Sequence, residues 1–365
     1  MGAYITAIGT ANPANRYSQE DLAQFMCDHL SESPSDQKKI KVLYRATGIQ
    51  HRYSVLDDYK KSLGTFTFYP NEKGLNPFPS TEKRMRLYRE KALPLAISAI
   101  TDCLGNYQSY AEFTHLVTVS CTGMYAPGLD VDLVKALNLS PDIRRNSLNF
   151  MGCYAAMNAT SIAKEICDNN PKASVLIVSV ELCSIHLQKE QTEDNLLAQS
   201  LFADGAAAMV VSGLQPSGTP ALEIVQSASQ LVISGQSDMA WQIGDYGFQM
   251  ALTSYVPKII EGGIKQLTAK LLDQSALELS DIDAFAIHPG GKKILEAIEL
   301  QLGLSKDQNQ AAYEILKNYG NMSSPTILFV LKNVWSKLKS QPNKKILSFA
   351  FGPGLTLESL LFKTT

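Results

Sequence analysis

Met151-Gly-Cys-Tyr-Ala-Ala156 and Tyr319-Gly-Asn-Met-Ser-Ser324 are two similar stretches that decide the fold. In each stretch a glycine is followed by a polar residue and then by small side chains, and each stretch is predicted to begin a helix. Cys153 lies 32 residues after the end of a hydrophobic strand at Cys121, and Asn321 lies 33 residues after a strand end at His288. Each predicted helix leads into another hydrophobic strand. This matching order indicates a duplicated βα unit whose pseudo-twofold symmetry brings Cys153 and Asn321 together.

The chain around these stretches alternates short β-branched runs with longer segments of helical period, which is typical of an α/β protein. We expect Ser80 to cap a helix with apolar positions from Met85 to Cys103, and a second helix to run from Cys153 towards Asn169. The expected buried strands are Leu116–Ser120, Val175–Val180, Ala207–Val211, Ala284–Ile287 and Lys345–Phe351.

Composition limits the class of protein. The 365 residues hold 33 Lys and Arg against 35 Asp and Glu, a net charge of −2, and 45% are hydrophobic. At about 150 residues per domain, this length predicts two domains. The near-neutral charge argues against nucleic acid or an anionic membrane as a partner, and no apolar run approaches the ~20 residues of a membrane span. We therefore expect a cytoplasmic protein.

Six cysteines are spread through the first half of the sequence, with no CxxC pair and no His/Cys cluster of zinc-site spacing. The chain is long for a disulfide framework, so the pattern indicates reduced thiols. HExxH, P-loop and GxGxxG motifs are also missing, so none of these signatures indicates a metal or nicotinamide site.

Three residues form a candidate catalytic set. Cys153 begins a predicted helix, where the helix dipole favours a thiolate and lowers the pKa. His288 ends a strand in Ile-His-Pro-Gly-Gly, a typical place for a site residue in α/β folds. Asn321 opens another predicted helix and either caps it or donates its amide to an oxyanion. The Gly352-Pro-Gly354 loop lets backbone approach a reacting group closely.

These residues resemble the type III polyketide synthases, which are chalcone-synthase-like enzymes of the thiolase superfamily. The resemblance covers nearly the whole chain. It rests on Met151-Gly-Cys-Tyr-Ala, Leu201-Phe-Ala-Asp-Gly, Ile287-His-Pro-Gly-Gly, Tyr319-Gly-Asn-Met-Ser-Ser and Phe351-Gly-Pro-Gly-Leu-Thr. It implies an α/β thiolase-like fold with five αβαβα layers from two duplicated halves. We expect residues 1–214 to carry the nucleophile and residues 215–365 to carry the histidine and asparagine.

The resemblance assigns the nucleophile to Cys153, the decarboxylation pair to His288 and Asn321, and the residue that orients malonyl groups to Phe202. It implies a homodimer that uses acyl-CoA and malonyl-CoA as substrates and needs no metal or nicotinamide cofactor, which fits the missing motifs. Further substrate-binding positions implied by the resemblance are Cys121, Thr122, Cys183, His186, Trp241, Met250, Ser323, Gly352, Pro353 and Gly354.

Several positions depart from the plant pattern. Lys39 matches a CoA-binding cation, but Val42 and Ala46 replace two others, and Arg45 is a nearby substitute. Cys183 is similar to microbial members with tunnels for long acyl chains. A flexible side chain at Met250 suits an aliphatic guest, and Trp241 fills volume that an aromatic starter needs. Ala126 stands at the position of the methionine that, in the family, a partner subunit usually inserts into the cavity.

The sequence thus predicts an acyltransferase that loads an acyl-CoA starter, expected to be aliphatic, on Cys153. It then extends the chain by decarboxylative condensation with malonyl-CoA and cyclises it to a pyrone, resorcinol or phloroglucinol-type product. Two alternatives stay open. One is another condensing enzyme, similar to β-ketoacyl synthase III or hydroxymethylglutaryl-CoA synthase, although the latter needs a glutamate and none stands near Cys121 in the sequence. The other is a non-catalytic partner of the same fold, which would be expected to lose Cys153, His288 or Asn321.

Overall fold

A computed structural model of the chain describes residues 2–105, 112–253 and 255–365. Its main strands fall into two sets with the same order and directions. In the first set β4 is parallel to β6, β6 is antiparallel to β7, and β7 is antiparallel to β1. In the second set β11, β12, β13 and β8 repeat this pattern, while β5 extends only the first set, parallel to β4. The first set is β1 (Tyr4–Ala11), β4 (His115–Ser120), β5 (Arg144–Asn149), β6 (Ser174–Leu182) and β7 (Asp204–Ser212); the second is β8 (Leu222–Leu231), β11 (Ala284–Ile287), β12 (Lys345–Gly352) and β13 (Thr356–Thr364).

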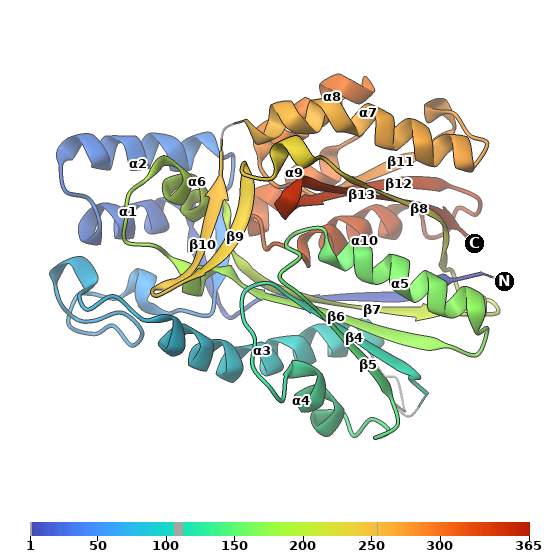
Figure 1. Cartoon of the computed structure of the whole chain (residues 1–365), viewed down its shortest axis with the longest axis horizontal. Helices are drawn as coiled ribbons and strands as arrows, with labels where there is room; N and C mark the ends of the chain where they lie inside the picture. The colour runs from blue at the N-terminus through green and yellow to red at the C-terminus, as the bar shows by residue number, and fades with distance from the viewer. Residues whose placement is uncertain (1, 106–111, 254) are drawn as a thin grey trace.

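Helices cover and separate the two sets, so that the molecule has five layers (Figure 1). Helices α3 and α4 cover the outer face of the first set, α5 and α10 lie between the sets, and α7 and α8 cover the second. A short pairing of β1 with β8 joins the sets into one nine-stranded sheet. This arrangement confirms the duplicated αβαβα fold. The helices of the layers are α3 (Thr81–Leu104), α4 (Leu129–Ala136), α5 (Ala155–Asn169), α7 (Val256–Gln274), α8 (Lys292–Leu302), α9 (Gln310–Tyr319) and α10 (Thr326–Leu338).

The five expected strands are all present, and each is as long as expected or longer at one or both ends. Helix α3 begins after Ser80, whose hydroxyl accepts a hydrogen bond from the Lys83 amide, as predicted for an N-cap. Alanines on one face of α5 are fully buried, which allows this central helix to approach its neighbours closely.

Two predicted helix starts are wrong. Helix α5 begins at Ala155, so Cys153 lies in the turn before the helix. Helix α10 begins at Thr326 after Pro325, so Asn321 does not cap it. Asn321 instead pairs with Phe202 in a β-bridge, because the positive φ of Gly320 turns the chain away from α9 before α10 starts.

A smaller group of elements lies at one end of the molecule, beside the two layered halves (left in Figure 1). Helices α1, α2 and α6 pack together there, and the β9–β10 ribbon lies between them and the layers. The bounds are β2 (Asn15–Ser18), α1 (Gln19–His29), α2 (Pro34–Ala46), β3 (His51–Ser54), η1 (Asp58–Lys60), η3 (Cys183–His186), α6 (Glu193–Leu201), β9 (Met239–Gly244) and β10 (Gly247–Leu252).

Candidate active site

Cys153 is held in a tight turn before α5. Gly152 has a φ of 80°, and a Cβ on it would lie 2.3 Å from Pro353 Cδ, so only glycine lets the Gly352-Pro-Gly354 loop pack against this turn. Cys153 is buried, and its Sγ lies 4.0 Å from Asn321 Oδ1. Burial raises the pKa of the Cys153 thiol to about 12, although hydrogen bonding with Ser323 and Asn321 acts in the opposite direction. The lowered pKa predicted from the helix dipole is therefore wrong.

His288 follows β11 and faces the same cavity as Cys153. Its backbone amide donates to Phe349 O at 2.8 Å, which fixes the residue against β12. The side chain is 1% exposed, and neither ring nitrogen has a hydrogen-bond partner among the described residues. Burial lowers the pKa of His288 to about 3, so the imidazole is neutral near pH 7. Two unpaired ring nitrogens in a buried site leave one donor and one acceptor available to a substrate.

Asn321 is fixed by both its backbone and its side chain. Its amide donates to Leu201 O at 2.9 Å, and its carbonyl accepts from Ala203 N at 2.8 Å. Its Oδ1 accepts from Ser323 N at 2.8 Å, and its Nδ2 donates to Gly290 O at 3.3 Å. With Oδ1 held by Ser323, the NH2 group faces the His288 segment. Its second N–H can therefore donate to an oxygen in the cavity.

One cavity of about 100 Å³ brings the three residues together with most of the predicted substrate-binding residues. The predicted residues that line it are Cys121, Thr122, Cys153, Cys183, His186, Phe202, Trp241, Met250, His288, Asn321, Ser323 and Pro353. Gly352 and Gly354 do not line it. Gly352 instead packs against Tyr154, where an added Cβ would lie 2.4 Å from the ring.

The β9–β10 ribbon is fastened to one wall of this cavity. Trp241 Nε1 donates to Cys121 O at 2.6 Å, and His186 Nε2 lies 2.7 Å from Thr122 O. Because a carbonyl only accepts, His186 carries its proton on Nε2, and its Nδ1 accepts from Phe248 N at 2.9 Å. Burial lowers the pKa of His186 to about 3, which keeps the ring neutral. The Trp241 indole thus closes this side of the cavity. Met250 is the residue paired with Trp241 on the neighbouring strand of the ribbon.

Glu181 is a buried residue that the sequence did not reveal. Its carboxylate accepts hydrogen bonds from Cys121 N at 3.0 Å, from Thr122 Oγ1 at 2.7 Å and from Ser324 Oγ. The expectation that no glutamate stands near Cys121 is therefore wrong: Glu181 is distant in the sequence but is bonded to Cys121 in the structure. Glu181 does not line the cavity, because these donors enclose it. Burial raises its pKa, and the hydrogen bonds oppose this rise.

The two proposed CoA-binding cations lie on α2, outside the cavity. Lys39 and Arg45 are exposed, and Arg45 lines a separate surface hollow between α1 and α2 together with Lys41. Within the ranges that the structure covers, no group of three His, Cys, Asp or Glu side chains is arranged to hold a metal ion. In the same ranges no helix is both long and apolar enough to cross a bilayer.

A buried cysteine, a neutral histidine and an oriented asparagine amide in one cavity of a thiolase-like fold define an acyltransferase of the condensing type. The N-terminal domain model of the chalcone and stilbene synthases matches residues 2–216, and the C-terminal domain model matches residues 223–365. The chain therefore belongs to the chalcone and stilbene synthase family, the type III polyketide synthases.

Relatives in several organisms agree with this assignment. An alpha-pyrone synthesis polyketide synthase-like protein, Pks18, of Mycobacterium tuberculosis is 33% identical over 99% of this chain and 91% of its own length. A putative chalcone synthase of Bacillus subtilis is 31% identical over 99% of this chain and 98% of its own. The crystal structure of the C-terminal type III polyketide synthase domain of Steely1 from Dictyostelium superposes with a TM-score of 0.91, at 28% identity. That superposition covers 100% of this chain and 99% of the domain.

Proposed function

We propose that this enzyme loads an aliphatic acyl-CoA on Cys153, extends it with malonyl-CoA, and closes the product to a pyrone or a phenolic ring. The observation that supports this most is the convergence of Cys153, His288 and Asn321 on one cavity. A pyrone is also the product class in the name of the mycobacterial relative. The apolar wall with Met250 and the indole of Trp241 favour an alkyl chain over an aromatic starter.

In the loading step, the Cys153 thiol gives its proton to the neutral imidazole of His288 as the sulfur attacks the thioester carbonyl. The carbon–sulfur bond to CoA breaks, and the departing thiolate takes the proton from His288. Burial disfavours a free Cys153 thiolate, so the proton leaves the thiol in the same step as the attack, and His288, which lines the same cavity, is the base that takes it.

In the extension step, malonyl-CoA enters the same cavity and loses CO₂, and its electron pair becomes an enolate. One N–H of His288 and the second N–H of Asn321 Nδ2 donate to the enolate oxygen. The Asn321 amide is held by Ser323 and Gly290 before the substrate arrives, and the His288 backbone is held by Phe349, so little reorganisation is needed to stabilise this charge. The enolate carbon then attacks the acyl group on Cys153, and the thiolate leaves. Phe202, which lines the cavity beside Asn321, would orient the malonyl group.

The remaining proposals concern organisation. Residues 1–214 and 215–365 would act as the nucleophile half and the oxyanion half of one site. CoA phosphates would contact Lys39 and Arg45, which are exposed on α2. A homodimer in the cytoplasm, without a cofactor, also stays a prediction. Strand β5 is an edge strand of the nine-stranded sheet, and Ala126 is exposed in the loop between β4 and α4, so both are accessible to a partner subunit. Light scattering in solution tests the dimer.

The test of the function is mass spectrometry of products from purified enzyme, malonyl-CoA and a panel of acyl-CoAs. The panel runs from acetyl to palmitoyl and adds benzoyl and coumaroyl. We expect malonyl-dependent pyrones or resorcinols with the alkyl starters. If no starter gives such a product, the proposal is wrong, and acylation of Cys153 alone would then indicate a carrier protein as the extender donor.

A further inference from the structure

Arg84, near the start of α3, is a fully buried cation that the mechanism does not use. Its Nε donates to Pro79 O at 2.9 Å, and its Nη1 donates to Ile185 O. The third nitrogen of the guanidinium, Nη2, is buried as well and has no hydrogen-bond partner among the described residues. Both acceptors are neutral carbonyls, so the positive charge of Arg84 is stabilised by dipoles alone.

Within the described ranges of the chain, no carboxylate forms an ion pair with Arg84. Burial lowers the pKa of Arg84, and the groups that oppose this fall are the phenols of Tyr69 and Tyr59 rather than an acid. Burying a charge without a counter-charge is unfavourable, and buried charges in proteins are normally paired. A negative charge beside Arg84 is therefore expected.

The Tyr69 hydroxyl is a second unpartnered group in the same region. It is buried, and the described part of the chain gives it no hydrogen-bond partner. Both residues lie against the Phe78 ring: the guanidinium carbon of Arg84 is 5.2 Å from its centre, and the Tyr69 ring centre is 6.0 Å from it. Burial raises the pKa of Tyr69, and the positive charge of Arg84 opposes this rise, which agrees with their proximity.

The two unpartnered groups have the same chemical character, because each is a hydrogen-bond donor. The Arg84 Nη2 atom carries N–H bonds and cannot accept, and the Tyr69 hydroxyl has one O–H to give. Buried donors of this kind are satisfied by an ordered water or an ion. A ligand that accepts from both donors and also supplies the missing negative charge is a small anion, since charge-assisted hydrogen bonds are the stronger ones.

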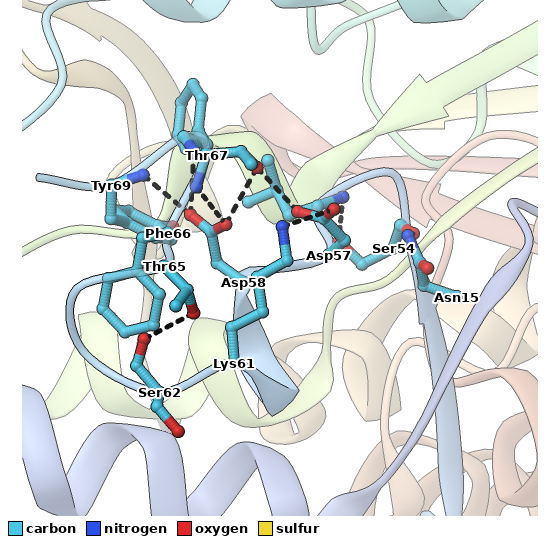
Figure 2. A network of polar contacts seen from close by, with 12 residues as sticks. Asn15, Ser54, Asp57, Asp58, Lys61, Ser62, Thr65, Phe66, Thr67 and Tyr69 are labelled. Carbon is cyan, nitrogen blue, oxygen red and sulfur yellow. Dashed lines mark hydrogen bonds and ion pairs between the residues drawn. The ribbon is translucent and has the colours of Figure 1, made fainter. Parts of the chain in front are cut away.

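Two carboxylates act on the Tyr69 hydroxyl, those of Asp58 and Asp204, but both are engaged by other donors. Asp58 accepts hydrogen bonds at 2.7–2.9 Å from three consecutive amides, those of Thr67, Phe68 and Tyr69. Figure 2 shows these bonds converging on the Asp58 carboxylate. Asp204 accepts from Val55 N at 2.8 Å and from the amide and hydroxyl of Ser184 at 2.7 and 2.6 Å. The protein therefore uses its own acids elsewhere, and a counter-charge for Arg84 has to come from outside the chain.

We propose that Arg84 Nη2 and the Tyr69 hydroxyl bind a monovalent anion of the size of chloride. The anion accepts a hydrogen bond from each group and balances the charge of the guanidinium. Arg84 does not line the catalytic cavity, but it holds the carbonyl of Ile185 next to His186, and a Cβ on Gly247 would lie 2.8 Å from its Cδ. The anion thus stabilises the wall made by η3 and the β9–β10 ribbon without contacting a substrate.

The experiment measures urea unfolding of the purified enzyme while sodium chloride replaces sodium gluconate at constant ionic strength. Gluconate is the reference anion because it is too large for a site between two buried side chains. With a Kd of about 1 mM, a rise in chloride from about 10 to about 100 mM should lower the unfolding equilibrium constant about ninefold. A crystal grown in bromide should show an anomalous peak between Arg84 and Tyr69.

Three variants assign the effect to this site. Arg84→Gln removes the charge and should abolish the chloride dependence, whereas Tyr69→Phe removes one donor, keeps the ring and should weaken it. Tyr17→Phe is the matched control. It also removes a buried tyrosine hydroxyl, which donates to Leu56 O at 2.8 Å, and it should keep the chloride dependence of the wild type even though it is less stable.

The outcomes do not depend on the function proposed above, because none of them is read from activity. If unfolding of the wild type is indifferent to chloride and bromide gives no peak, water satisfies the two donors and the proposal is wrong. If Arg84→Gln and Tyr69→Phe both keep the wild-type chloride dependence, the anion binds elsewhere, and the proposal is wrong as well. If Arg84→Gln does not fold, the comparison of Tyr69→Phe with Tyr17→Phe decides the question.

Discussion

Arg52 is expected to position Asn321 for decarboxylation. Its guanidinium is 6% exposed and ties together Gln19, Gln199 and Phe202. Its side chain also fills the space beside Gly320, where a Cβ would lie 2.8 Å from Arg52 Cγ. Arg52 therefore contacts two residues that are next to the Asn321 backbone. One is Gly320, which precedes Asn321 in the sequence, and the other is Phe202, which lies between Leu201 and Ala203, the two residues to which the Asn321 backbone is bonded. A shift of Arg52 should therefore move the Asn321 amide.

The perturbation is Arg52→Lys. A lysine ammonium keeps the charge but lacks the planar fork that reaches the three acceptors together. Losing two charge-assisted hydrogen bonds at about 1.5–3 kcal/mol each should lower the free energy of unfolding by about 3–6 kcal/mol. If about 1.4–2.8 kcal/mol of oxyanion stabilisation is lost with the Asn321 geometry, malonyl-CoA decarboxylation falls about 10–100-fold. Cys153 is held by a different contact, between Gly152 and Pro353, so its acylation should change much less.

The assay compares two rates in the same variant, CO₂ release from malonyl-CoA and Cys153 acylation by an acyl-CoA, with urea unfolding alongside. Arg84→Lys is the matched control. Arg84 is likewise a buried arginine, but it donates to the carbonyls of Pro79 and Ile185, away from Asn321. It should lose stability without the selective loss of decarboxylation. Equal losses of both rates in Arg52→Lys, or the same selective loss in Arg84→Lys, would refute the reasoning.

Three further predictions concern the site. Cys153→Ala should abolish the acyl-enzyme seen by mass spectrometry yet leave some decarboxylation of malonyl-CoA, and a variant that still made product would contradict the mechanism. His288→Gln should make stability less sensitive to acid. The folded pKa of His288 is about 3 against ~6.5 unfolded, so stability present above pH 6.5 is lost as the pH falls. The free energy of unfolding of the wild type should therefore fall by ~2 kcal/mol from this group between pH 7 and pH 5. Urea unfolding at both pH values should show that His288→Gln lacks this fall. Trp241→Ala should admit coumaroyl-CoA as a loading substrate, because it removes the indole that closes one wall; continued exclusion would mean that another side chain limits aromatic starters.

The duplicated unit was predictable because it depends on local pattern. Strand runs, turn glycines and the nearly equal spacings of 32 residues from Cys121 to Cys153 and 33 residues from His288 to Asn321 are all visible along the chain. Glu181 was not predictable in the same way. It lies 60 residues from Cys121, and its burial in a strand follows from the pairing of β4 with β6, which no local pattern specifies.

The wrong predictions share a physical cause, which is that tertiary contacts override local preference. Asn321 is a good N-cap by residue type, but its backbone bonds to Leu201 and Ala203 hold it in a bridge before α10 starts. A thiol at a helix N-terminus is favoured as a thiolate, but Cys153 is buried, and desolvation of the thiolate outweighs that effect.

The two halves are equivalent in strand order but not in what they contribute to the site. Cys121 and His288 follow the equivalent strands β4 and β11, while Cys153 and Asn321 precede the equivalent helices α5 and α10. Duplication thus brings four positions to the centre of the molecule. The chemistry needs one nucleophile and two oxyanion donors, which are different groups, so the symmetry must be broken in the sequence. The bonds of Asn321 to Leu201 and Ala203 cross from the second half to the first. Because Asn321, the proposed oxyanion donor, is held by backbone bonds to the half that contains Cys153, neither half contains the complete candidate site alone.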